Sequence, residues 1–166
     1  MISEQWDPRI PSWDLKAEPR NIQKSKAVVL VNGKPSEFAD VHDGPAVYIG
    51  RSNDHYDLSE STLHNPFSVQ DHGRLESVLK YAEHLVEQVQ QDQKFREAVW
   101  RCHGRPVACW CVPELCHGHV LNLFLAYRLR TDWNLETIQE QVQDRVRSHV
   151  DYQIQQGNAN PAEYQA

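Results

Sequence analysis

Three short apolar runs, separated by stretches with helical periodicity, constrain the fold of this 166-residue chain more than any other feature. The runs are AVVLV (27–31), PAVYIG (45–50) and VACWC (107–111). Short β-branched runs bounded by turn residues are typical of buried strands. Because strands that alternate with helices usually form a parallel sheet, we predict an α/β domain with a mostly parallel sheet.

The helical stretches show apolar residues at a period of 3.6. The first predicted helix contains Leu75, Val78, Leu79, Ala82, Leu85, Val86 and Val89, with Asp71 as its N-cap. Further helices are predicted at 95–100 and 120–129. The last has a narrow apolar stripe, capped by Asn134, that consists of Leu135, Ile138, Val142, Val146 and Val150. This stripe could pack on the sheet layer or form a homodimer seam.

These patterns divide the chain into four parts: an N-terminal arm (1–25), one α/β domain (26–131), an appended amphipathic helix (132–156) and a flexible tail (157–166). The net charge of -6 argues against bulk binding to nucleic acid or to an anionic membrane. The longest apolar stretch, 120–129, is too short to span a bilayer. Because the N-terminus lacks signal-peptide features, we expect a cytoplasmic protein with reduced thiols.

The segment VACWCVPELCHGH (107–119) holds three of the four cysteines. On a strand, Cys109 and Cys111 point to one face and Trp110 points to the other, where we expect it in the core. The chain then turns, and Cys116 and His117 begin the next helix. Unpaired backbone N–H groups at that helix start would stabilise a thiolate or a bound anion.

Three interpretations of this segment stay open. Zinc could be held by Cys109, Cys111, Cys116 and His117, or by His119 in place of His117, although this spacing is not that of a standard zinc knuckle. The cysteines could instead be small buried apolar residues. Finally, Cys111 or Cys116 could be a redox-sensing or nucleophilic thiol.

A second group of candidate residues follows the run 45–50. Gly50 allows a tight turn or a close approach to a ligand, and Arg51 suits the recognition of phosphate or carboxylate. Beyond a polar loop lies Asn65-Pro66-Phe67, where the Asn65 amide could contact a base or a ribose. The alternative is structural: a turn at Gly50, a surface ion pair of Arg51, and packing of Phe67.

The combination of Tyr48-Ile49-Gly50-Arg51, Asn65-Pro66-Phe67 and Cys109-Trp110-Cys111 to Cys116-His117-Gly118 resembles the domain-of-unknown-function family 4326 (DUF4326) of bacteria, archaea and phages. The resemblance covers about residues 26–129 and implies a small, three-layer, Rossmann-like domain. The family pattern ends in Cys-His-Gly-Asp, whereas residue 119 here is His. That acid is either a functional group or a helix cap.

Ligands of parallel sheets bind at the carboxyl ends of the strands. We therefore expect a nucleotide- or nucleoside-type ligand in one crevice, with hydrolysis or transfer at an N-glycosidic bond as the possible reaction. The expected ligand-binding residues are Tyr48, Gly50, Arg51, Asn65, Pro66, Phe67, Gly118 and His119. The expected catalytic residues are Cys111, Cys116 and His117, with Glu114 as the nearest acid. The alternatives are a non-catalytic zinc module that binds a partner, and a thiol redox sensor.

Overall fold

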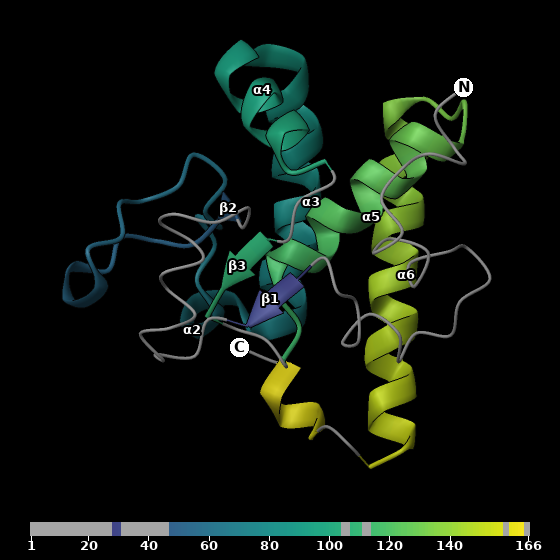
Figure 1. The fold of residues 1–166 in the computed structure, drawn as a ribbon. Coiled ribbons are helices and arrows are strands. Elements are labelled where there is room, and N and C mark those ends of the chain that lie inside the picture. Colours follow the sequence, from purple (N-terminus) through teal and green to yellow (C-terminus); the bar gives the residue numbers. More distant parts are fainter. Residues whose placement is uncertain (1–27, 31–46, 104–106, 111–113, 158–159, 165–166) are drawn as a thin grey trace.

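The computed structural model describes residues 28–30, 47–103, 107–110, 114–157 and 160–164, which form a mixed α/β structure that is mostly helical (Figure 1). The elements are β1 (Val28–Leu30), β2 (Val47–Tyr48), η3 (Asp54–Tyr56), α2 (Val69–His72), α3 (Arg74–Gln91), α4 (Gln93–Arg101), β3 (Val107–Cys109), α5 (His117–Arg130), α6 (Leu135–Gln155) and η4 (Pro161–Tyr164). The Cys111 position and the arm at 1–25 lie outside the described residues.

The small sheet is parallel throughout its described strands, with the order β1-β3-β2. Val107 of β3 is in register with Val28 on one side and Val47 on the other. Beyond β2, the Ile49 N–H still donates to the Ala108 carbonyl at 3.0 Å. The predicted parallel sheet is thus confirmed, and the carboxyl ends of β2 and β3 lie at one edge.

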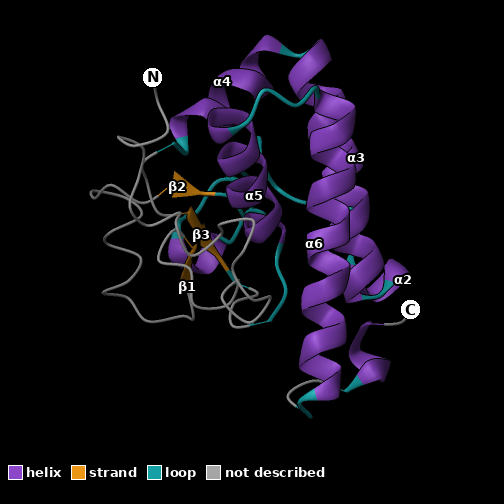
Figure 2. Ribbon diagram, turned by 90° about the vertical axis from the view of Figure 1, so that its right-hand side faces the viewer, coloured by secondary structure: helices purple, strands orange, loops and turns teal. Residues whose placement is uncertain are grey.

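Helix α5 lies between the sheet and the pair of long helices α3 and α6 (Figure 2). Its residues from Val120 to Tyr127 are all buried, because one side packs on β1 and β3 and the other on α3 and α6. No helix in the described part of the chain is long and apolar enough to cross a membrane.

The start of the first long helix differs from the prediction that Asp71 is its N-cap. Ser68 instead caps the short helix α2 by accepting from the Asp71 N–H at 3.1 Å, and α3 begins after Gly73. The φ of 78° at Gly73 interrupts the helical path between the two. The prediction for the last helix is confirmed, since the Asn134 side chain accepts from the Thr137 N–H at 2.8 Å.

The apolar stripe of α6 is covered within the chain. Ile138, Val142, Val146 and Val150 are buried, and α6 packs along α3 and α5. Gln143 adds a hydrogen bond from its Nε2 to the Leu79 carbonyl of α3, at 3.1 Å. The helix expected to be an appendage is therefore part of the core. In the segment expected to be a flexible tail, η4 contacts α3.

Candidate functional site

The residues that follow β2 and β3 line one cavity of about 260 Å³. Arg51 contributes to its wall from the loop after β2, and His117 from the start of α5, although they lie 66 positions apart in the sequence (117 − 51). The described lining residues are Gly50, Arg51, Asn65, Phe67, Ser68, Val69, Arg74, Ser77, Val78, Cys109, Trp110, Leu115, Cys116 and His117. The three sequence segments that resemble the family therefore all contribute described residues to this cavity at the carboxyl edge of the sheet.

A cluster of two thiols and one imidazole forms part of the cavity lining. Cys109 ends β3, Cys116 precedes α5, and His117 is the first residue of α5. Their three ligand atoms lie within 4.8 Å of one another, and all three residues are buried. Such a Cys₂His cluster could hold a metal ion.

The orientation of the His117 ring is fixed by the backbone of the strand segment. Its Nε2 lies 2.7 Å from the Ile49 carbonyl oxygen, which can only accept, so Nε2 carries the proton. In the neutral ring, Nδ1 then carries no proton and can only accept a hydrogen bond. Nδ1 lies 3.6 Å from the Cys116 sulfur and 3.9 Å from the Cys109 sulfur. The histidine thus presents its lone pair to both thiols.

Tyr81 of α3 packs against the same imidazole. The two rings meet edge to face with their centroids 4.8 Å apart, and the tyrosine hydroxyl donates to the Leu63 carbonyl at 2.7 Å. Burial raises the pKa of Tyr81 well above its usual value, and the nearby cysteines raise it further. The phenol is therefore a neutral support for His117, and no sequence pattern had marked it.

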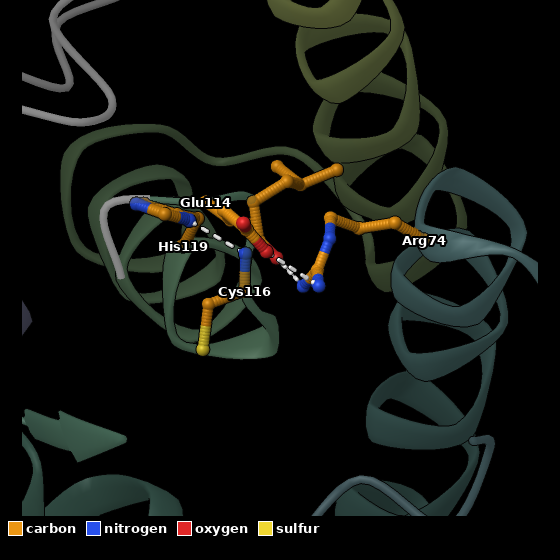
Figure 3. A network of polar contacts seen from close by, with 5 residues as sticks. Arg74, Glu114, Cys116 and His119 are labelled. Atoms are coloured by element: carbon orange, nitrogen blue, oxygen red, sulfur yellow. Dashed lines mark hydrogen bonds and ion pairs between the residues drawn. The ribbon is translucent and has the colours of Figure 1, made fainter. Parts of the chain in front are cut away.

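The start of α5 is held by a capping box in which histidine takes the place of an acid. The Gly118 N–H donates to the Cys116 sulfur at 3.4 Å. The Cys116 N–H donates to His119 Nδ1 at 3.0 Å (Figure 3). An aspartate or glutamate at this position would accept the same bond. Of the two roles considered for residue 119, the geometry shows the helix cap. The Gly118 N–H, which we expected to hold an anion, has the Cys116 sulfur as a partner within the protein.

Residues after β2 form a tight corner around Tyr48. Its hydroxyl accepts from the Trp110 indole N–H at 2.8 Å and donates to the Arg51 carbonyl at 2.5 Å. A Cβ on Gly50 would fall 2.6 Å from Tyr48 Cζ, so only glycine fits here without displacing the phenol. Trp110 is half-buried and lines the cavity, which corrects the expectation that it belongs to the core.

The Asn65-Pro66-Phe67 turn is held by hydrogen bonds on both sides. Asn65 Nδ2 donates to Ser77 Oγ at 2.9 Å, and its Oδ1 accepts from the Phe67 N–H at 3.0 Å. Arg51 donates from Nε and Nη2 to the Asn65 carbonyl, at 3.3 and 2.9 Å. The Asn65 amide thus organises the turn, and Pro66 is exposed and is not among the cavity residues.

A second guanidinium, that of Arg74, lies at the cavity, although no sequence motif indicates it. Arg74 at the start of α3 donates to the Leu115 carbonyl at 3.2 Å and pairs with the Glu114 carboxylate at 2.5 Å (Figure 3). Glu114 is exposed, and the Cys116 sulfur points away from this ion pair. Neither Glu114 nor any other carboxylate is among the described residues that line the cavity.

Fold and site together define a small α/β domain with a Cys₂His cluster in a cavity at the carboxyl edge of a parallel sheet. The sequence model of the family described as "Domain of unknown function (DUF4326)" matches residues 34–126, more than half of the 166 residues. The chain belongs to this family, as the resemblance predicted. No curated protein and no solved structure gave a match to the chain.

Proposed function

We propose that the protein binds a nucleotide- or nucleoside-type ligand in the cavity. The observation that carries this proposal is that Arg51 from the loop after β2, Arg74 from α3 and His117 from α5 line one cavity. Guanidinium groups suit phosphate, and aromatic residues supply faces for a base. Phe67 and Trp110 are the aromatic residues of the lining. Small-ligand sites commonly combine an apolar wall with a few convergent polar groups.

Arg51 and Arg74 are the candidates for the anionic part of the ligand. Both already donate to backbone carbonyls, which fixes the position of each side chain relative to the cavity. The Glu114 carboxylate that pairs with Arg74 is exposed, so an incoming phosphate can compete with it at low cost. Asn65 acts indirectly in this proposal, by holding the turn that positions Phe67.

The first experiment measures the melting temperature with a panel of nucleosides, nucleoside monophosphates and diphosphates, and inorganic phosphate. We expect a phosphate-bearing nucleotide to raise it, and Arg51→Ala to remove most of that shift. Arg101→Ala is the matched control, since Arg101 is exposed at the end of α4. No shift with any member of the panel would contradict the proposal, as would an equal shift in Arg51→Ala.

Hydrolysis or transfer at an N-glycosidic bond extends this proposal. Because no carboxylate lies among the described lining residues, His117 is the candidate acid–base group, with Cys116 beside it. Release of free base from a bound nucleoside, detected by chromatography, would support the reaction. Binding without release in any condition would leave a ligand-binding protein and contradict the catalytic extension.

The second candidate function is a zinc site, favoured by the buried Cys109, Cys116 and His117 cluster. Cysteine and histidine are preferred ligands of zinc, and a reducing cytoplasm, where we propose this protein resides, keeps thiols available for it. Stoichiometric zinc in protein purified without added metal would support this function, and its absence after zinc addition would contradict it.

We also propose a Rossmann-like fold, supported by the β1-β3-β2 order and the helices between strands.

A further inference from the structure

We infer that the two candidate functions share one site: Cys109, Cys116 and His117 form a three-ligand metal centre whose remaining coordination position faces the ligand cavity. This inference rests on the proposed zinc site and goes beyond it. A zinc module would enclose its metal in protein ligands, whereas this arrangement exposes the metal to whatever binds beside Arg51.

The spacing of the donor atoms suits a single small ion. A tetrahedral zinc ion with ordinary bond lengths separates a sulfur and a nitrogen ligand by about 3.6 Å. The His117 Nδ1 lies 3.6 Å from one sulfur and 3.9 Å from the other. The two sulfurs lie within 4.8 Å of each other, against about 3.8 Å in a tetrahedral site, so side-chain shifts of up to about 1 Å would close the cluster around the ion.

The histidine also has the second contact that metal-binding histidines usually have. Such residues bind the metal through one ring nitrogen and donate the other N–H to a carbonyl or carboxylate, which orients the ring. Here His117 Nε2 donates to the Ile49 carbonyl at 2.7 Å, and the Tyr81 ring supports the imidazole from α3.

The open position follows from where the three ligands lie. All three line the cavity, and within the described residues no fourth histidine, cysteine or carboxylate joins the cluster. Catalytic zinc sites have three protein ligands and an open position, whereas structural sites have four. The open position faces the cavity that Arg51 and Arg74 also line. The matching ligand is a small anion-bearing molecule that also offers a nitrogen, oxygen or sulfur atom to the metal.

Cobalt(II), which reports thiolate ligation and coordination number by its absorption, tests the centre in the full chain. We expect one cobalt per protein with thiolate charge-transfer bands. Cys109→Ser and Cys116→Ser should each weaken binding by at least about tenfold, because loss of even an outer-shell partner of a metal ligand costs about 10–100-fold in affinity. Cys102→Ser is the matched control, because Cys102 is a buried thiol outside any disulfide that donates to the Ala98 carbonyl and is not part of the cluster. Equal cobalt affinity in all three variants would overturn the assignment.

Azide added to the cobalt-loaded wild-type protein tests the open position without any variant. We expect azide to change the visible bands at unchanged cobalt stoichiometry, and Cys111→Ser to retain that stoichiometry. Unchanged bands, or loss of cobalt in Cys111→Ser, would overturn the open site and leave a closed zinc module. Absence of cobalt and zinc binding would overturn the zinc proposal as well. The rise in melting temperature that a nucleotide causes in metal-free protein, and its loss in Arg51→Ala, tests the ligand proposal separately.

Discussion

Ser77 gives the sharpest stability test, because one buried hydroxyl holds the turn that shapes the cavity. Its Oγ donates to the Phe67 carbonyl at 2.6 Å and accepts from Asn65 Nδ2 at 2.9 Å. Ser77→Ala removes both bonds. At about 0.5–1.5 kcal/mol net for each hydrogen bond, the two together contribute about 1–3 kcal/mol. Because Ser77 lines the cavity, water can satisfy the vacated groups, so we expect the middle of this range, about 2 kcal/mol.

Urea unfolding followed by circular dichroism measures this difference as a shift of the midpoint at constant m-value. Ser148→Ala is the matched control: Ser148 is exposed within α6, and we expect its replacement to change the free energy of unfolding by less than about 0.5 kcal/mol. If Ser77→Ala costs no more than Ser148→Ala, the hydroxyl does not hold the turn and this reasoning is wrong.

Three further predictions follow from single positions. Gly118→Ala would place a Cβ 3.0 Å from Ile49 Cδ1, so the overpacking cost of about 1–3 kcal/mol should exceed the helix gain of about 1 kcal/mol; a stabilised variant in urea unfolding would contradict this. Asn122 is buried and its amide has no hydrogen-bond partner among the described residues, so Asn122→Leu should raise the free energy of unfolding by about 1–2 kcal/mol, and a lowered midpoint would argue against this. Burial lowers the pKa of His84 from 6.5, an effect that Glu87 opposes and His64 reinforces. Below pH 6.5 the unfolded chain therefore binds more protons at His84 than the folded chain does, so the free energy of unfolding falls as the pH drops below 6.5. His84→Gln should reduce this fall in a pH series of urea midpoints, and an unchanged fall would refute the assignment.

Much of the fold was predictable, because local chemistry and tertiary packing agree along most of the chain. The apolar residues of α3 and α6 recur at the helical period, and the structure buries most of them where these helices pack on each other and on α5. Asn134 is a strong cap with no competitor nearby. The prediction that Asp71 caps the long helix was wrong because Asp71 lies inside the short helix α2. Ser68, three residues earlier, caps that helix by accepting from the Asp71 N–H, and Gly73 then interrupts the helical path. Two adjacent capping signals cannot be ranked without the tertiary path of the chain.

The candidate site was predictable where its residues follow a strand or belong to the Asn65-Pro66-Phe67 motif. Gly50, Arg51, Cys116 and His117 were found because parallel strands place such residues at one edge. Ser77, Tyr81 and Arg74 were missed because they lie on a helix whose periodicity identifies a packing face but not the polar contacts within it. Trp110 was placed in the core by strand alternation, but the regular strand ends at Cys109, so alternation no longer determines where the next side chain points.

The packing of α5 on the sheet and the geometry of the cluster depend on one another. Gly118 lets the helix start approach the sheet, where its missing side chain leaves room for Ile49 and Val107. That approach brings His117 Nε2 within 2.7 Å of the Ile49 carbonyl, and the bond directs Nδ1 toward the two sulfurs. A side chain at residue 118 would place its Cβ 3.0 Å from Ile49 Cδ1, so we expect it to shift the imidazole as well as destabilise the fold. The glycine in Cys-His-Gly is in this way a requirement of the site, although it contacts no ligand itself.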